Sequence, residues 1–131
     1  MRSLDTNILV RWLVKDDARQ AAKVKAMLQS AIEGGERLFI PVTVVLELEW
    51  VLRSRYSMPK PSIIKALVSL LETNDLVFQL ELAIERAVSH YRRGNADFAD
   101  CLHLGLSTIE NNLPLVTFDK KAARLEGATL L

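Results

Sequence analysis

The sequence has one cysteine, two histidines and no long apolar run. Cys101 has no second thiol to pair with, so an internal disulfide is excluded and a reducing, cytoplasmic environment is expected. No apolar stretch reaches the roughly 18 residues that span a bilayer, and the first residues lack the charged-then-apolar pattern of a signal peptide. We therefore expect no membrane partner.

The sequence also lacks an excess of positive or of negative charge. The formal net charge is +1, so global charge predicts neither the presence nor the absence of a nucleic-acid partner. There is no internal repeat and no low-complexity segment. The 131 residues, half of them apolar, suffice for one hydrophobic core, and we predict a single domain over residues 1–131.

Short apolar strands alternate along the chain with helices of 3.6-residue periodicity. The first strand ends at Asp5, and further strands are predicted at 38–40, 76–78, 115–118 and 128–130. Helices are predicted at 8–14, 18–33, 42–56, 62–72, 81–92, 97–110 and 120–125. This alternation predicts an α/β fold with a mostly parallel sheet, and right-handed crossovers place helices on both of its faces.

Acidic residues recur where these strands and helices meet. Asp5 and Asp119 each follow a strand, at the sheet edge where open α/β sheets bind ligands. Glu47 lies near the first turns of its helix. Asp97 and Asp100 are three residues apart, so they share a face at the start of theirs.

Carboxylates gathered in a dry site repel one another unless a cation lies among them. An oxygen-only set without histidine or cysteine favours Mg²⁺ or Mn²⁺ over zinc. Such an ion binds a phosphate oxygen and lowers the pKa of a water, which makes phosphodiester hydrolysis the natural reaction.

Each acid also has a plainer interpretation. Asp5 and Asp97 fit turn or cap positions equally well. Glu49 rivals Glu47, because residues two apart face differently around a helix. The residue pattern alone leaves these alternatives open.

Four segments occur in a characteristic order: Leu-Asp-Thr-Asn at 4–7, Glu-Leu at 47–48 with Val-Leu at 51–52, Asp-Phe-Ala-Asp-Cys-Leu at 97–102, and Val-Thr-Phe-Asp at 116–119. Together they resemble the motifs of the PIN domain, and more narrowly those of the VapC-type toxin ribonucleases of toxin–antitoxin pairs. The resemblance covers essentially the whole chain. It implies a three-layer α/β/α sandwich with a mostly parallel central sheet.

The resemblance also implies roles for individual residues. Its metal-site acids match Asp5, Glu47, Asp100 and Asp119, and the Glu-Leu-x-x-Val-Leu pattern favours Glu47 over Glu49. Asp97 stands where the family often carries an acid. Polar residues that orient ligands or waters are matched by Thr6, Asn7 and Thr117. The implied partners are an RNA substrate, a small antitoxin protein and a second copy of the chain in a homodimer.

Other residues favour packing or surface roles. Cys101 is expected to be a buried apolar thiol, and His103 to pack or lie at the surface. Trp12 and Trp50 are expected in the core rather than stacked on bases, with a place in the lining of a partner groove as the alternative. Several cations follow the acids along the chain and either hold RNA phosphates or form solvated faces: Arg11, Lys15, Arg53, Arg55, Lys120 and Lys121.

The leading hypothesis is therefore a metal-dependent endoribonuclease. An alternative is a PIN-type binding module that acts in a DNA-binding regulatory complex, with weak or no nuclease activity. Another phosphoryl-transfer enzyme is less favoured, because the chain has no glycine-rich phosphate loop and no second acid directly after Asp5. RNA cleavage by the isolated protein separates the first two hypotheses.

Overall fold

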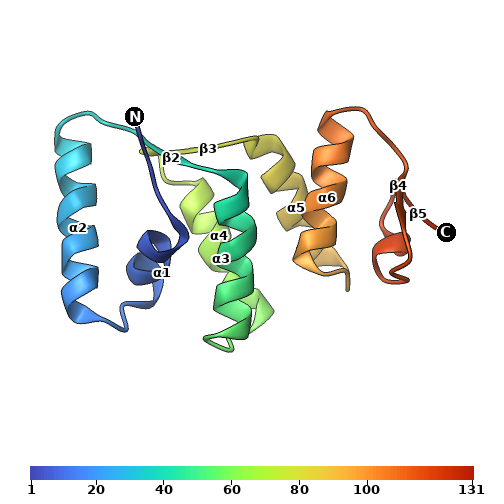
Figure 1. Cartoon of the computed structure of the whole chain (residues 1–131), viewed down its shortest axis with the longest axis horizontal. Coiled ribbons are helices and arrows are strands. Elements are labelled where there is room, and N and C mark those ends of the chain that lie inside the picture. Colours follow the sequence, from blue (N-terminus) through green and yellow to red (C-terminus); the bar gives the residue numbers. More distant parts are fainter. The chain divides into compact units, whose positions relative to one another are not determined.

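The computed structural model describes residues Met1–Leu131. It contains six α-helices, one 3₁₀-helix and five short strands (Figure 1). The chain forms two compact units, Met1–Gln79 and Leu80–Leu131. The assignment of residues 1–131 to a single domain stays a prediction.

The N-terminal unit alternates three strands with four helices. Their order is β1 (Arg2–Ser3), α1 (Thr6–Val14), α2 (Ala18–Glu33), β2 (Leu38–Ile40), α3 (Val42–Ser54), α4 (Lys60–Leu71) and β3 (Leu76–Phe78). The strands pair in parallel in the order β1-β2-β3, with Arg2 opposite Leu38 and Leu38 opposite Leu76. The parallel arrangement requires helical crossovers, which the intervening helices supply.

Local sequence signals set the helix ends in this unit. The Asp17 carboxylate accepts a hydrogen bond from the Gln20 backbone N–H at 3.0 Å and so begins α2. Gly34 caps the other end, and Gly35 turns the chain with a φ of 70°, where a side chain would be strained. Pro41 and Pro59 precede α3 and α4.

The predicted apolar stripe of α3 forms the centre of the N-terminal core. Its members Val45, Leu48, Val51 and Leu52 are all buried. Ile40 of β2 and Ile63 of α4 are fully buried as well. Burial of these side chains holds the helices of the unit to its sheet.

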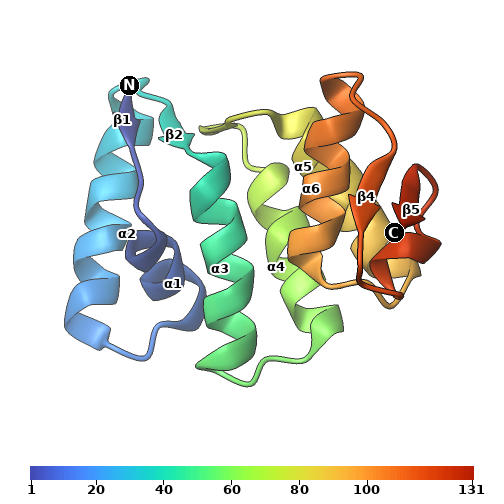
Figure 2. The ribbon, with the colours of Figure 1, turned by 45° about the vertical axis from the view of Figure 1, so that its right-hand side comes forward.

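The C-terminal unit contains α5 (Glu81–Arg93), α6 (Phe98–Ile109), β4 (Leu115–Thr117), the 3₁₀-helix η1 (Ala122–Arg124) and β5 (Ala128–Leu130). The two helices lie side by side (Figure 2). β4 and β5 form a parallel pair in which Thr117 stands opposite Leu130.

A small-residue contact brings α5 and α6 very close. A Cβ atom added to Gly105 would lie 2.6 Å from the backbone oxygen of Ala83, well inside van der Waals contact. Tyr91 and Phe98 pack edge to face near the other end of the pair, with ring centroids 5.3 Å apart. Glycine at position 105 therefore sets the spacing of the two helices.

The predicted α/β class with parallel strands is confirmed, and four predicted elements have the observed bounds: 18–33, 38–40, 76–78 and 128–130. The first strand is shorter than predicted, although the Leu4 N–H still bonds to the Phe39 oxygen at 2.8 Å. The predicted helix 120–125 forms only the short η1. The Asp119 carboxylate holds the first N–H groups of this segment, and Leu125 is already extended. None of the helices combines the length and apolar character that a membrane crossing needs.

Replacing Gly105 with alanine tests the close contact between α5 and α6. Alanine is ordinarily the better helix former by about 1 kcal/mol. Here the added methyl group would overlap the Ala83 carbonyl, so we expect the free energy of unfolding to fall by about 1–3 kcal/mol. Urea unfolding followed by circular dichroism measures the change.

Gly94→Ala is the matched control, because its new methyl group would stand at an ordinary 3.5 Å from the His90 oxygen. Equal stability losses in the two variants would contradict the steric explanation.

Candidate functional site

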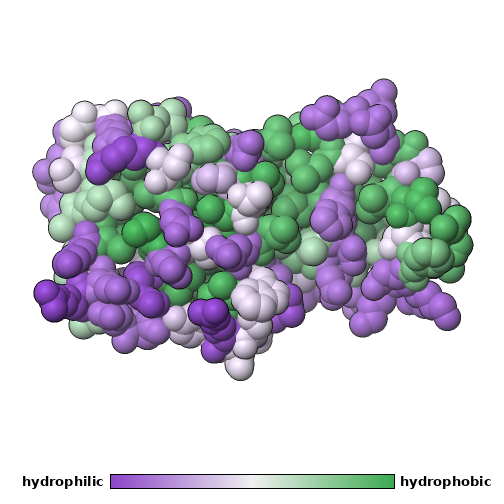
Figure 3. All heavy atoms as spheres, in the orientation of Figure 1, coloured by the Kyte–Doolittle hydropathy of each residue, from purple (hydrophilic) through white to green (hydrophobic).

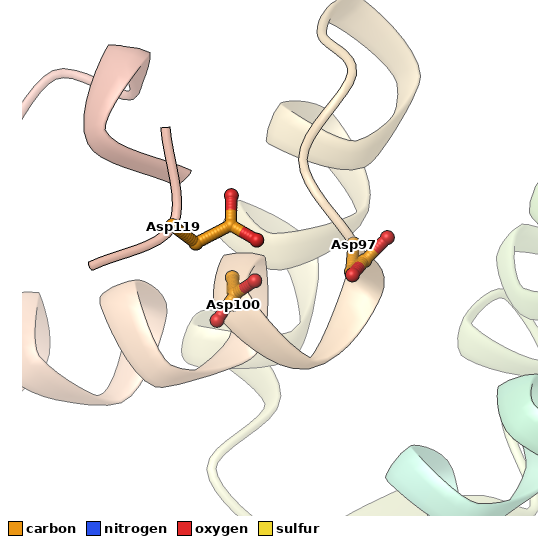
Figure 4. Close-up of side chains that lie close together, drawn as sticks. All are labelled: Asp97, Asp100 and Asp119. Atoms are coloured by element: carbon orange, nitrogen blue, oxygen red, sulfur yellow. The ribbon is translucent and has the colours of Figure 1, made fainter. Parts of the chain in front are cut away.

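Three aspartates of the C-terminal unit form a compact group (Figure 4). Asp97 precedes α6, Asp100 lies in the first turn of α6, and Asp119 follows β4. One carboxylate oxygen from each lies within 4.8 Å of the others. The structure thus places Asp97 and Asp100 together, as their spacing predicts, and adds Asp119 from a distant segment.

Asp119 is held by its neighbours along the chain. Its backbone N–H donates to the Thr117 hydroxyl oxygen at 3.0 Å. Its carboxylate Oδ1 accepts hydrogen bonds from the N–H groups of Lys121 at 2.8 Å and Ala122 at 2.9 Å. One carboxylate oxygen is therefore occupied by backbone, and the other can bind a ligand.

Asp97 is the N-cap residue of α6, but its side chain makes no capping hydrogen bond. The residue is exposed, and one of its carboxylate oxygens lies within 4.8 Å of oxygens of Asp100 and Asp119 (Figure 4). The interpretation of Asp97 as a simple cap therefore does not describe its side chain.

The surroundings of Asp100 disfavour its negative charge. Burial raises the pKa of this carboxyl above its ordinary value, and the charge of Asp119 raises it further. The positive charge of His103 acts in the opposite direction, and Asp97 adds a smaller upward effect. A cation among these three oxygen donors would relieve the repulsion, so the set fits a hard divalent ion such as Mg²⁺ or Mn²⁺.

A second arrangement lies in the N-terminal unit and is centred on Thr6. The Thr6 backbone N–H donates to Asp5 Oδ1 at 2.7 Å, which makes Asp5 the N-cap of α1. The buried Thr6 hydroxyl donates to Glu47 Oε1 on α3. Thr6 therefore joins the two acids that the sequence predicts for the site in this unit, while Asn7 is exposed beside them.

The structure distinguishes the two glutamates of α3. Glu47 is exposed and accepts the Thr6 hydroxyl. Glu49 is only 2% exposed and pairs with Arg53 at 2.9 Å. Glu47 is thus the one that reaches solvent, whereas Glu49 is engaged in the fold.

The predicted acids therefore form two sets in two units: Asp5 with Glu47, and Asp97 with Asp100 and Asp119. The joint use of all five by one ion stays a prediction.

Two tryptophans are more exposed than the sequence predicts, and one histidine lies close to the acidic group. Trp12 and Trp50 are 37% and 49% exposed, so their assignment to the core is wrong. They lie beside the buried stripes of their helices, which run through Leu9 and Val10 on α1 and through Val51 and Leu52 on α3. His103 is exposed, and its charge lowers the pKa of Asp100. The three-residue spacing of the two residues in the sequence was the signal that they lie close together. Cys101 is fully buried, as expected.

A sequence model of the PIN domain matches residues 3–128 of the chain. The chain belongs to the PIN domain family. Among curated proteins, it is 29% identical over 104 residues to a protein named VapC ribonuclease from Aquifex aeolicus (strain VF5), covering 78% of this chain and 75% of that protein.

The raised pKa of Asp100 predicts how the stability of the folded protein changes with pH. The folded protein binds this proton more tightly than the unfolded chain, so stability falls as the pH rises from about 3.9, the ordinary aspartate pKa, through the raised pKa. At neutral pH all of this stability is lost, because Asp100 is ionised beside the other carboxylates. Asp100→Asn removes the negative charge that causes the loss. We therefore expect its Tm to exceed that of the unsubstituted protein at about pH 7 in EDTA, and the difference in Tm to shrink toward about pH 4.

Thermal unfolding across this pH range measures the effect, with Glu110→Gln, an exposed acid of the same unit, as the matched control. Added Mn²⁺ should raise the Tm of the unsubstituted protein more than that of Asp100→Asn. A lower Tm for Asp100→Asn at neutral pH in EDTA would contradict the repulsion described here.

The hydroxyl of Thr6 can be tested separately. Thr6→Val keeps the shape but removes the donor to Glu47, and we expect divalent-ion affinity to weaken by about 10-fold. Thr6→Ser retains the hydroxyl and should bind nearly as well. Isothermal titration with Mn²⁺ measures both, and equal affinities for the valine and serine variants would show that the hydroxyl plays no part in ion binding.

Proposed function

We propose that this chain is a metal-dependent endoribonuclease that hydrolyses RNA phosphodiester bonds, acting as the toxin of a type II toxin–antitoxin pair. The observation that carries the proposal is the group formed by Asp97, Asp100 and Asp119 in a PIN domain. The similarity to a protein named VapC ribonuclease supports the same assignment.

In this proposal Asp5, Glu47, Asp100 and Asp119 hold Mg²⁺ or Mn²⁺, and Asp97 assists. The ion, when bound, supplies a Lewis acid that binds a phosphate oxygen and lowers the pKa of a water. The donors are carboxylate oxygens alone, which suits these hard cations.

The surrounding residues position the acids. The Thr6 hydroxyl fixes the Glu47 carboxylate, and the Thr117 hydroxyl fixes the backbone of Asp119. Two backbone N–H groups hold one Asp119 oxygen, which fixes the orientation of the other. Asn7, exposed in the first turn of α1, supplies an amide that can orient water or substrate.

We also infer a cytoplasmic homodimer, a single domain over residues 1–131 and a small antitoxin partner. The surface of α1 and α2 suits such a partner, because a cavity of about 70 Å³ there is lined by Ile8, Trp12, Leu28 and Ile32. Of these lining residues, Trp12 and Ile32 are also exposed to solvent. Hydrophobic side chains show between hydrophilic ones over these helices in Figure 3. An apolar helix of the antitoxin could cover them.

Cleavage of a mixed RNA pool by the purified protein tests the proposed activity. We expect cuts with Mg²⁺ or Mn²⁺ and none with EDTA. Asp5→Asn and Asp100→Asn should each lower the cleavage rate by about 100-fold or more, because each removes a carboxylate that the ion needs. Glu72→Gln and Glu110→Gln remove exposed acids of the two units as matched controls and should cleave normally.

The outcomes separate the two leading hypotheses. Folded, antitoxin-free protein that makes no metal-dependent cuts would favour a binding module that acts with a DNA-binding partner. Cleavage that survives both aspartate substitutions would place the active site elsewhere.

A further inference from the structure

The turn over residues 118–121 is fixed directly to the acidic group. Asp119 lies within it and holds the turn in place through the Lys121 and Ala122 N–H groups on its carboxylate. Its backbone oxygen also accepts the Ala123 N–H at 3.0 Å. The side chains that flank Asp119 along the chain therefore cannot be far from any substrate that the group binds.

Phe118 is the most exposed large apolar side chain of the protein, at 77%. Its ring makes no aromatic contact, in contrast to the pair formed by Tyr91 and Phe98. Hydrophobic side chains gather over β4 and β5 in Figure 3, and Val116 of β4 is exposed as well. A phenyl ring exposed to water does not stabilise the core of its unit. An exposed apolar side chain of this size is typical of a surface that contacts a ligand.

Lys120 and Lys121 follow on the same turn. Both side chains are exposed, and neither forms an ion pair. The neighbouring group contributes three carboxylates, which repel an approaching phosphate chain. A divalent ion offsets two of these charges, and unpaired ammonium groups beside the group can offset the rest.

We propose that residues 118–121 form an RNA-binding turn in which Phe118 stacks on a base and Lys120 and Lys121 bind phosphates near the bond that is cut. The inference rests on the proposed function. One exposed aromatic ring among charged residues suits single-stranded nucleic acid, because every base offers a face for stacking and the lysines follow its backbone. The same residues beside an acidic group suit a buried protein interface less well, because their charges would have to be desolvated.

Binding of a fluorescently labelled single-stranded RNA of mixed sequence, measured by anisotropy in EDTA, tests the turn without cleavage. Phe118→Ala should weaken binding by about 10-fold and leave its salt dependence unchanged, whereas Phe118→Trp should retain affinity. The double variant Lys120→Gln with Lys121→Gln should reduce the slope of log affinity against log salt by about 1.4, or about 0.7 for each phosphate that a lysine no longer neutralises.

Cleavage with Mg²⁺ gives a second readout, in which these variants should raise KM about as much as they weaken binding and leave kcat nearly unchanged. Leu82→Ala and Arg86→Gln are the matched controls. They remove an exposed apolar side chain and an exposed cation of the same unit, and Arg86 is not among the charges that act on Asp100. Both should bind and cleave RNA like the unsubstituted protein.

Several results would overturn the inference. Unchanged binding by Phe118→Ala and by the double lysine variant, in a protein that still cleaves RNA, would reject the turn and leave the proposed function standing. Equal losses in Leu82→Ala would mean a general surface effect. A Phe118→Ala variant with a changed oligomeric state and normal RNA affinity would make the turn a protein-docking surface. Failure of the unsubstituted protein both to bind and to cleave RNA would reject the turn and the proposed function together.

Discussion

Repulsion between like charges is the constraint on which the C-terminal unit depends. Three carboxylates lie within 4.8 Å of one another there, and Asp100 is partly withdrawn from water. The fold offsets part of this cost with backbone groups. Asp97 and Asp100 lie at the N-terminus of α6, where the helix dipole favours negative charge, and two N–H groups hold Asp119. A bound cation would relieve the part of the repulsion that these backbone groups leave.

The close contact of α5 with α6 supports this arrangement. Because Gly105 lets the backbones approach, α6 lies against α5 at a point shortly after Asp100 along the chain. Phe98 and Cys101, which flank Asp100 on this helix, are both buried. This packing opposes the repulsion between carboxylates, which would otherwise push the first turn of α6 away from Asp119.

Much of the fold could be predicted from residue periodicity. The helix over 18–33 has both a cap, Asp17, and a double-glycine stop, and its bounds are as predicted. Where one residue can cap, end a strand and bind a ligand at once, the pattern is ambiguous. Asp5 begins α1 two residues earlier than expected, and Asp119 reduces a predicted helix to η1. Such residues serve local structure and the candidate site together, so their local signals cannot be separated.

The candidate site was less accessible to sequence reasoning than the fold. The choice between Glu47 and Glu49 depends on which one is buried, and burial follows from packing between segments far apart in the chain. The grouping of Asp119 with Asp97 and Asp100 likewise depends on how β4 lies against α6. The exposure of Trp50 and Phe118 has no signal in residue type, because aromatic residues most often pack inward.

The hydrogen bond from Thr6 to Glu47 also constrains how α3 can dock. A shift of α3 by one residue would present Leu46 or Leu48 to the Thr6 hydroxyl, leaving this buried donor unpaired. A shift by two would present Glu49, but would place Arg53 at the buried position of Val51 and so break the hydrophobic stripe. The Thr6 hydroxyl and the hydrophobic stripe together therefore select one register of this 13-residue helix, and Thr6→Val tests folding specificity as well as chemistry.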